Sequence, residues 1–365
     1  MLKFLFLIFI CSQSYGQNIV QQLDSVMRKN FADNKPGAAL LVVKNGKVSY
    51  KKSVGLANAD TQEKISAATN FRMASVSKQF TAMCIMLLVQ QHKISYEDNL
   101  LKFFPNWNKK VGSSIKIKHL LTHSSGIWDY EILIPENQPI QISDAGVVKL
   151  LLKKDSTYFK PGAAFQYSNS GFCVLEQIIE KASGLKYVQF IEQHIFKPLR
   201  MNNTRIYEEG KLIPNRAMGF AINQNNEIIP SDQSITSATK GDGCVYTSLN
   251  DYQKWTSALV SNKLINIRNQ LKRINHAIEG TVNIHYGLGW FNSIGAKNTL
   301  ALYHTGSTCG FSNAVKIIPE NQFCIVFFSN IADNLKPFYQ AEALLKKYNI
   351  DDCEIDFKKT IDLTR

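Results

Sequence analysis

Residue patterns typical of β-strands lie near both ends of this chain, and patterns typical of helices fill its middle. Residues 38–43 and 48–50 are β-favouring runs on either side of Asn45-Gly46, a pair that favours a two-residue hairpin turn. Further strand-like runs lie at residues 299–303, 314–318 and 323–329. An antiparallel sheet assembled from both termini, with a helical lobe inserted between them, joins these runs most simply.

The expected helices share apolar residues that recur at intervals of three and four positions. They cover residues 20–31, 75–91, 144–154, 171–182, 187–196, 249–260 and 337–348, with Ser143 and Gly184 as candidate capping residues. We therefore expect an α/β (α+β) fold of two lobes with a cleft between them. The sheet lobe, flanked by helices, spans about residues 17–75 and 235–350, the all-helical lobe spans about 76–234, and residues 351–365 form a tail.

The first 16 residues have the pattern of a secretory signal peptide. Lys3 precedes an apolar stretch over residues 4–11 that is too short to span a bilayer, and Ser14-Tyr15-Gly16 offers small residues at a cleavage site. A lipid anchor at Cys11 is disfavoured because bulky Ile10 stands where a small residue is expected. We expect export to the periplasm or beyond, and no other stretch predicts a membrane span.

Composition excludes several classes of protein. With 365 residues, 45% apolar and only 19% charged, the chain is not disordered. The net charge of +13 is scattered, without a basic stripe interleaved with aromatic residues, so no nucleic-acid partner is expected. His119 and His123 have the i, i+4 spacing of a metal pair, but no third ligand lies nearby and no Cys-x-x-Cys occurs. We expect no metal and no other cofactor.

Six cysteines follow residue 16, an even number that permits disulfides in an exported protein. Cys84, Cys173 and Cys324 lie in apolar runs and are interpreted as core residues. Cys244 and Cys309 are the one pair that merits a test for a bridge.

Ser75-Val76-Ser77-Lys78 is one of five Ser-x-x-Lys sequences, the others starting at Ser49, Ser113, Ser183 and Ser237. Only Ser75 opens a long apolar helical pattern, on which positions i and i+3 share a face. A hydroxyl there lies near the positive end of the helix, and the Ser75 N–H is free for a substrate oxyanion. A desolvated Lys78 would lose its proton more readily and then accept that of the serine. The simpler alternative is a capping serine and a surface lysine.

Two further segments carry candidate site residues. Tyr167-Ser168-Asn169 follows Pro161-Gly162, and its loop would present a phenol able to relay protons beside an amide. His304-Thr305-Gly306-Ser307 ends a predicted strand, where Gly306 would permit close approach of another backbone segment and the Ser307 N–H would be a second oxyanion donor. The alternatives are a core tyrosine, an asparagine cap and a hydrogen-bonded core histidine. Trp128, Trp255 and Trp290 belong either to a pocket or to the core.

Together these segments resemble the serine β-lactamase and penicillin-binding-protein-like family, and more narrowly its class C β-lactamase, D-amino-acid peptidase and carboxylesterase branch. Residues 71–82, 117–126, 161–171 and 286–290 match the family's nucleophile helix, its "IxHLLTHxSG" segment, its "PGxxFxYSNxG" segment and a "YGLGW" segment. The resemblance covers roughly residues 20–345 and implies a two-lobed fold.

The resemblance also implies covalent catalysis by a hydrolase. Ser75 would attack a carbonyl group while Lys78 and Tyr167 manage its proton, with the division of labour between them left open. The N–H groups of Ser75 and Ser307 would hold the oxyanion, and Asn169 would contact Lys78 or the substrate amide. The partner would be a small-molecule or peptide acyl substrate, with cell-wall-derived compounds among the candidates.

One departure bears on the substrate. Many β-lactam-recognising relatives carry Lys-Thr-Gly where this chain has His304-Thr305-Gly306. A histidine is largely neutral at pH 7 and is a poorer partner for a substrate carboxylate. This favours carboxypeptidase, D-aminopeptidase, amidase or esterase activity over β-lactamase activity. The alternatives are a non-catalytic binding or scaffolding descendant of the same fold and, more remotely, a cysteine hydrolase using Cys309.

Overall fold

The computed structural model describes residues 18–295 and 298–351, together with residues 360 and 363. The predicted signal peptide, Cys11 included, and most of the predicted tail lie outside the described residues. Within the described part of the chain, no helix is long and apolar enough to cross a membrane.

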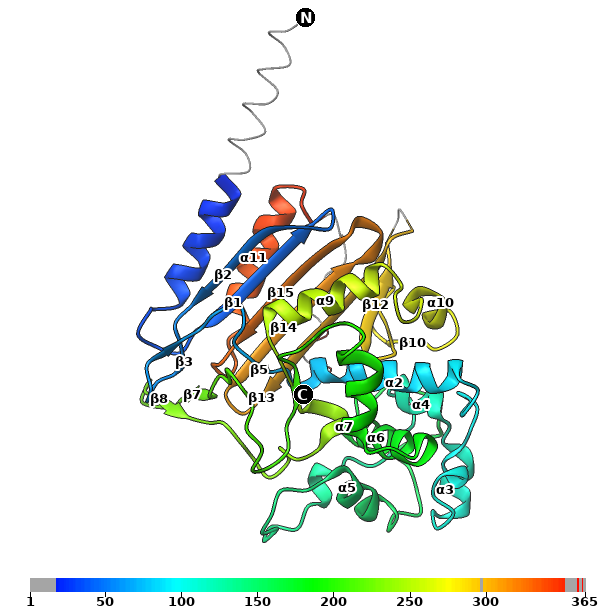
Figure 1. Ribbon diagram of the computed structural model, residues 1–365. Helices are drawn as coiled ribbons and strands as arrows, with labels where there is room; N and C mark the ends of the chain where they lie inside the picture. The colour runs from blue at the N-terminus through cyan, green and yellow to red at the C-terminus, as the bar shows by residue number, and fades with distance from the viewer. Residues whose placement is uncertain (1–17, 296–297, 352–359, 361–362, 364–365) are drawn as a thin grey trace, which may run out of the picture.

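An antiparallel sheet of eight strands forms the centre of the molecule, in the order β10-β11-β12-β13-β14-β15-β1-β2 (Figure 1). Its strands are β1 (Ala38–Lys44), β2 (Lys47–Val54), β10 (His276–Ala277), β11 (His285–Gly287), β12 (Trp290–Ile294), β13 (Leu300–Thr308), β14 (Phe311–Ile318) and β15 (Phe323–Ser329). Strand β1 pairs with β15 in a register that sets Ala38 opposite Ser329. The prediction of one antiparallel sheet built from both ends of the chain is confirmed.

The turn between β1 and β2 shows why this hairpin forms. Asn45 and Gly46 have φ angles of 50° and 72°, both in the left-handed region that two-residue hairpin turns require. The central strand β1 then buries both of its faces: Ala38, Leu40 and Val42 contact one apolar cluster, and the alternate residues contact another. Burial on both faces explains why this strand is a continuous apolar run.

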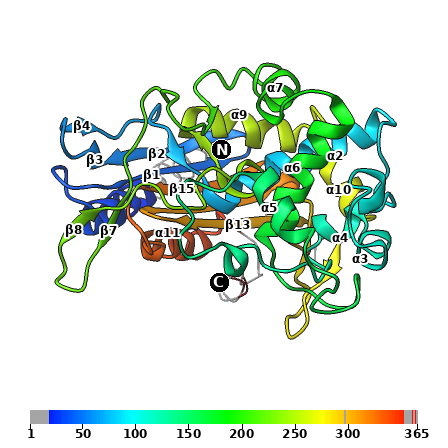
Figure 2. The same ribbon diagram turned by 90° about the horizontal axis from the view of Figure 1, so that it is seen from below.

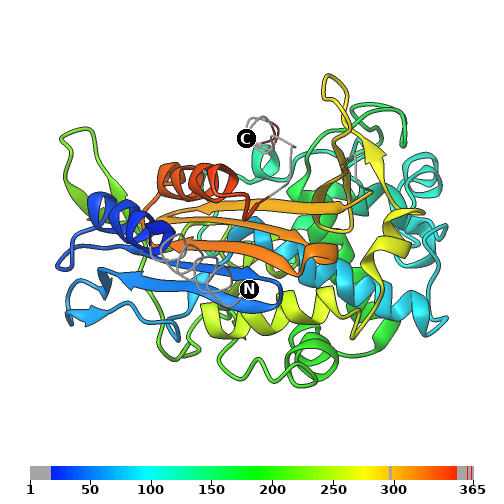
Figure 3. The ribbon, with the colours of Figure 1, turned by 90° about the horizontal axis from the view of Figure 1, so that it is seen from above.

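Different helices cover the two faces of the sheet (Figure 3). The helix over residues 18–30 and α11 (Lys336–Lys347) pack on one face, where Leu23, Met27 and Phe338 belong to the same apolar cluster. On the other face lie α9 (Leu249–Val260) and the inserted lobe. The candidate site residues of the sheet therefore have to lie at this second face.

The inserted lobe is mostly helical, and its helices gather at one end of the molecule (Figure 2). They are α2 (Lys78–Gln90), α3 (Lys109–Ser114), α4 (Ile117–Leu121), α5 (Asp144–Leu151), α6 (Asn169–Ser183) and α7 (Tyr187–Ile191), with a π-helical turn at Glu192–Phe196. Ser143 and Gly184 cap α5 and α6 as predicted. The lobe also contains three short strands that the expected all-helical lobe lacks: β6 (Arg205–Ile206), β7 (Phe220–Ile222) and β8 (Ile228–Pro230).

A small second sheet fixes the chain directly before Ser75. Strand β9 (Val245–Thr247) pairs with both β5 (Phe71–Arg72) and β6, and the Met73 N–H donates to the carbonyl of Val245 at 2.8 Å. The short helix α8 (Lys240–Gly243) immediately precedes β9. This sheet therefore brings α8 and the Ser75 segment together.

Candidate active site

Ser75 lies in a tight turn between β5 and α2. The turn is a 3-10 helix, η1 (Ala74–Ser77), so the predicted α-helix starts three residues later than expected, at Lys78. Side chains at i and i+3 eclipse one another in a 3-10 helix. This geometry places the Lys78 Nζ 3.0 Å from the Ser75 Oγ. Ala74 has a φ of 49°, an uncommon conformation for a residue with a side chain, directly before the half-buried Ser75.

Lys78 is fully buried, and three oxygen atoms surround its amine. Nζ donates to Asn169 Oδ1 at 2.8 Å and to the backbone carbonyl of Asp242 at 3.0 Å, and its third contact is Ser75 Oγ. The two carbonyl oxygens can only accept, so each holds one N–H group of the amine. The third position of the amine faces the Ser75 hydroxyl, the one partner that can donate as well as accept.

Asn169 is oriented by a residue that the sequence did not single out. Its Nδ2 donates to Glu131 Oε1 at 3.0 Å, which turns its Oδ1 toward Lys78. Glu131 lies in the 3-10 turn η3 (Glu131–Leu133) and is exposed. The one feature of the sequence that could have pointed to Glu131 is its position, five residues after Gly126, the last residue of a segment that matches the family.

Tyr167 lies beside Lys78 without a hydrogen bond to it. The Lys78 Nζ is 5.1 Å from the centre of the Tyr167 ring. The Tyr167 hydroxyl is buried and has no hydrogen-bond partner within the described part of the chain. The structure thus places this phenol at the site with its donor unused.

His123 holds the Tyr167 loop, a role that the sequence did not indicate. Its Nδ1 accepts from the Ser168 N–H at 3.1 Å, and its ring lies 4.2 Å from that of Tyr167. Burial lowers the pKa of His123 well below its ordinary value, and the charge of Lys78 adds to this effect. A neutral His123 therefore links the segment after α4 to the start of α6.

Strand β13 brings the His304 segment against the Ser75 turn. Contrary to the expectation that this segment ends a strand, β13 continues to Thr308. A side-chain carbon built on Gly306 would lie 2.1 Å from the carbonyl oxygen of Met73 and 3.2 Å from Ser75 N. Only glycine permits this approach, and it sets exposed Ser307 directly beyond the point of contact.

His304 is fully buried and both of its ring nitrogens have partners. Nδ1 lies 2.6 Å from the carbonyl of Thr305, which can only accept, so Nδ1 carries the proton; Nε2 then accepts from the Tyr286 hydroxyl at 3.0 Å. The pKa of His304 is lowered to about 3. Burial is the main cause and the charge of Lys78 adds to it, whereas the hydrogen bond to the Thr305 carbonyl acts in the opposite direction. His304 is a neutral core histidine whose nitrogens do not face Ser75.

Several other candidates have structural surroundings instead. Trp255 and Trp290 are 1% exposed in the core, and Trp128 packs on Tyr158 with ring centres 4.7 Å apart. The His119 Nδ1 accepts from the Lys116 N–H, and among the described residues no group of three ligand-type side chains is placed to hold a metal.

The candidate disulfide between Cys244 and Cys309 does not form, because both thiols are free. Cys244 is buried directly after α8, where its thiol donates to the carbonyl of Lys240. Cys309 lies in the turn between β13 and β14 with a φ of 44°. The two cysteines occupy separate elements, a helix end and a hairpin turn.

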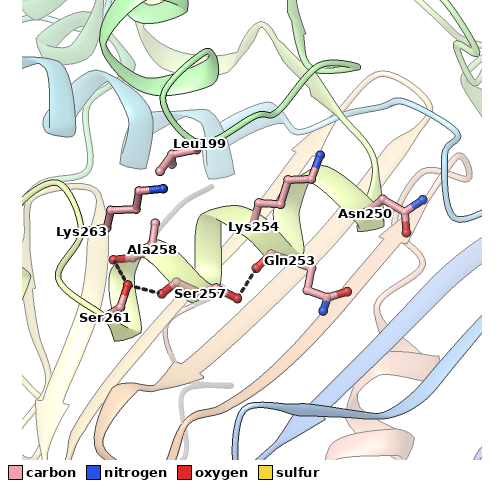
Figure 4. A pocket seen from close by; sticks show the side chains of 8 residues that line it. All are labelled: Leu199, Asn250, Gln253, Lys254, Ser257, Ala258, Ser261 and Lys263. Carbon is pink, nitrogen blue, oxygen red and sulfur yellow. Dashed lines mark hydrogen bonds between the residues drawn. The ribbon is translucent and has the colours of Figure 1, made fainter.

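A hollow of about 520 Å³ lies along α9, away from the predicted site residues (Figure 4). Most of the residues that line it have polar side chains, and two are lysines: Leu199, Asn250, Gln253, Lys254, Ser257, Ala258, Ser261 and Lys263. Both lysine amines are engaged with backbone carbonyls, Lys254 with Arg200 and Lys263 with Pro198. This hollow contributes nothing to the Ser75 site.

Known proteins are similar to this chain in sequence and in fold. Residues 18–349 match the family model described as Beta-lactamase. The chain is 28% identical to Penicillin-binding protein 4* of Bacillus subtilis (strain 168) over 330 residues, covering 86% of this chain and 72% of that protein. It is 26% identical to protein flp of Staphylococcus aureus (strain MW2) over 332 residues, 87% of this chain but only 64% of that protein.

Solved structures agree on the fold. D-amino acid amidase from Ochrobactrum anthropi SV3, complexed with L-phenylalanine amide, superposes with a TM-score of 0.75 at 19% identity, covering 91% of this chain and 99% of that one. Because the family model spans nearly the whole of the described chain, this protein is a member of the Beta-lactamase family.

Proposed function

We propose that this protein is an exported serine hydrolase that forms an acyl-enzyme at Ser75 with an amide, peptide or ester substrate. The observation that carries the proposal is the environment of the Lys78 amine, where two carbonyl acceptors leave the third position to the Ser75 hydroxyl. A surface lysine next to a capping serine would have no such arrangement. Membership of the Beta-lactamase family supports the same chemistry.

In the first step, the Ser75 hydroxyl proton moves to the lone pair of Lys78, and Oγ forms a bond to the substrate carbonyl carbon. The carbonyl oxygen becomes an oxyanion, held by the N–H groups of Ser75 and Ser307. The bond to the leaving amine or alcohol then breaks and that group takes a proton from the Tyr167 hydroxyl, which has no hydrogen-bond partner among the described residues, while the Lys78 ammonium returns a proton to the Tyr167 oxygen. Water then attacks the acyl carbon and gives a proton to the Lys78 amine. The bond to Oγ breaks, the acid leaves, and Lys78 passes this proton to the Ser75 oxygen.

The surroundings of His304 narrow the substrate class. A neutral histidine with both nitrogens engaged offers no positive charge to a substrate carboxylate. We therefore favour amidase, peptidase or esterase activity on acyl compounds that need no carboxylate contact at this position. The similarity to a D-amino acid amidase supports testing D-aminoacyl amides first.

The signal-peptide pattern of residues 1–16 supports the proposal that the enzyme acts outside the cytoplasm. N-terminal sequencing of protein recovered from the cell envelope or medium tests this point. The expected mature chain starts at Gln17, and a cell-associated chain that still starts at Met1 would contradict export.

Labelling with a fluorophosphonate probe tests the nucleophile. The wild type should become labelled and the Ser75→Ala variant should not, while Ser77→Ala, which changes a neighbouring hydroxyl in the same turn, should retain its label. Labelling that survives Ser75→Ala would refute the assignment.

A substrate panel then separates the activities: a D-aminoacyl p-nitroanilide, a D-Ala-D-Ala peptide, a short-chain p-nitrophenyl ester and a chromogenic cephalosporin, each assayed with wild type and Ser75→Ala. Turnover of the amide or ester that depends on Ser75, with little cephalosporin turnover, is the expected result. Stoichiometric labelling without turnover of any of the four would instead indicate a binding protein.

A further inference from the structure

A buried acidic residue lies directly behind the candidate active site. Asp242, in α8, is 6% exposed, and its backbone carbonyl accepts from the Lys78 amine. Its side-chain Oδ1 is buried and has no hydrogen-bond partner among the described residues. A buried oxygen without a hydrogen-bond partner lowers the stability of the fold, so its presence beside the candidate base is unusual for a structural residue.

The segment that carries Asp242 is held tightly against the start of α2. The Thr81 hydroxyl donates to the carbonyl of Gly241 at 2.6 Å, and the Ser77 hydroxyl accepts from the Val245 N–H at 3.1 Å. A side-chain carbon on Gly241 would lie 2.1 Å from the carbonyl oxygen of Phe172 in α6. Asp242 is thus held at a constant position relative to Lys78.

Lys78 has no direct counter-ion among the residues that the structure describes. Within the described part of the chain, its amine contacts a hydroxyl and two carbonyl oxygens, and no carboxylate lies in ion-pair contact with it. When Lys78 takes the serine proton, a full positive charge appears on a completely buried side chain. Such a charge requires a nearby negative charge or strong dipoles.

Among the described residues, the charge of Lys78 acts on the carboxyl groups of Asp242 and Glu131, and of these two residues Asp242 is the buried one. Burial raises the pKa of Asp242, whereas Lys78, a hydrogen bond with Thr239 and Arg72 lower it. The other titratable groups that interact with it are Tyr130 and Glu131 near η3, Asp144 in α5, Cys173 in α6 and Cys244 after α8. Lys78 and Arg72 are the cations of this set, so both favour the ionised carboxylate.

We propose that Asp242 is a positioning residue that stabilises the positive charge formed on Lys78 when Ser75 is deprotonated. The proposal rests on the acyl-enzyme function stated above. The serine proton moves to Lys78 while the Asp242 carboxylate keeps its charge, so the pair ends as an ammonium and a carboxylate. The carboxylate thereby lowers the energy of the oxyanion intermediate without touching the substrate.

The test compares wild type, Asp242→Asn and Asp242→Ala by the pH profile of kcat/KM for a p-nitrophenyl ester. The alanine variant keeps the backbone carbonyl that binds Lys78 and avoids a buried, unpartnered amide. Both variants should lose at least ~10-fold in kcat/KM, and the acid limb of the profile should move to lower pH by about one unit, because the protonated amine has lost a neighbouring anion.

Glu176→Gln is the matched control. Glu176 is a buried carboxyl group of α6 that interacts with Asp144, and Lys78 is not among the charges that act on it. This variant should keep the acid limb in place. An unmoved acid limb in both Asp242 variants would overturn the inference, even if the rate fell, because a purely structural residue would behave in this way.

The two proposals fail in different ways. A wild type that is neither labelled nor active refutes the acyl-enzyme function itself. A wild type that is labelled at Ser75, with Asp242 variants that match its pH profile, refutes only the role of Asp242.

Discussion

Two lysines among the described residues are completely buried, and their surroundings differ in kind. Lys316 in β14, on the α11 side of the sheet, contacts the carboxylates of Glu342 and Asp351 at 2.9 and 2.5 Å. Lys78, on the opposite side, contacts a hydroxyl and two carbonyl oxygens instead. The direct contact with Glu342 joins the Lys316 amine in the sheet to helix α11. The partners of Lys78 are all uncharged, and one of them is a hydroxyl that can also donate a hydrogen bond.

The comparison teaches that burial alone does not identify a candidate base. What distinguishes Lys78 is that one of its partners, the Ser75 hydroxyl, can donate as well as accept, and that none of its three contacts is a carboxylate. The following predictions can break this distinction or sharpen it, from the largest expected effect to the smallest.

Lys78→Met should reduce ester turnover by about 10³-fold, because the serine loses its proton acceptor while the methionine keeps most of the buried volume. The thermal unfolding temperature should change little or increase, since a buried polar group has been removed. Steady-state kinetics and a melting curve on the same preparation measure both. A variant that keeps a tenth of the wild-type rate would remove Lys78 from the mechanism.

Lys316→Met should have the opposite pattern of effects, with a loss of stability and little change in turnover. Removing this cation leaves Glu342 and Asp351 buried near each other, which should lower the free energy of unfolding by about 3 kcal/mol. The rate per folded molecule should stay within about twofold of wild type. Chemical denaturation and active-site titration separate the two effects, and a selective loss of turnover would show that the two lysines are not functionally distinct.

Tyr167→Phe should slow turnover of an amide by about 10²-fold, because the phenol is the proposed proton donor to the leaving group. The fold should tolerate the change well, since the hydroxyl has no partner among the described residues. Esters with good leaving groups need less protonation and should be affected less. Equal losses on a p-nitroanilide and a p-nitrophenyl ester would contradict this role.

A third buried basic side chain is that of His304. The effect expected for it is the smallest of the four and concerns how the stability of the fold depends on pH. Its pKa falls from an ordinary value of 6.5 to about 3, so between these values the folded protein binds fewer protons at this site than the unfolded chain. The stability contributed by neutral His304 is therefore present above pH 6.5 and is lost as the pH falls toward 3. Urea denaturation measures the free energy of unfolding of wild type and of His304→Gln. The difference between the two should be smaller at pH 4 than at pH 7, and a difference that stays constant would contradict a neutral, buried His304.

The sequence predicted the parts of this protein that depend on local chemistry. The Asn45-Gly46 hairpin, the capping residues Ser143 and Gly184 and the span of α9 all follow from rules that act within a few residues. The grouping of Ser75 with the Tyr167 and His304 segments came from motif resemblance, because nothing in local pattern shows that three distant segments meet.

The residues that sequence analysis missed act through contacts between distant elements. Asp242 contributes a backbone carbonyl to Lys78, and any residue type has one. Glu131 accepts a hydrogen bond from the side-chain amide of Asn169, a residue 38 positions away along the chain. The neutral state of His304 depends on Tyr286 and on complete burial, neither of which a strand-like run of residues specifies.

The pairing of β1 with β15 has a consequence for biosynthesis. The first strand has no inner neighbour until residues 323–329 are available, and the Ser75, Tyr167 and Ser307 segments come from three separate stretches of the polypeptide. A truncated chain that lacks strands β13, β14 and β15 would contain Ser75, Lys78 and Tyr167 without Ser307 beside them. Under the proposed mechanism, the site at Ser75 therefore becomes complete only after these C-terminal strands of the sheet have been made.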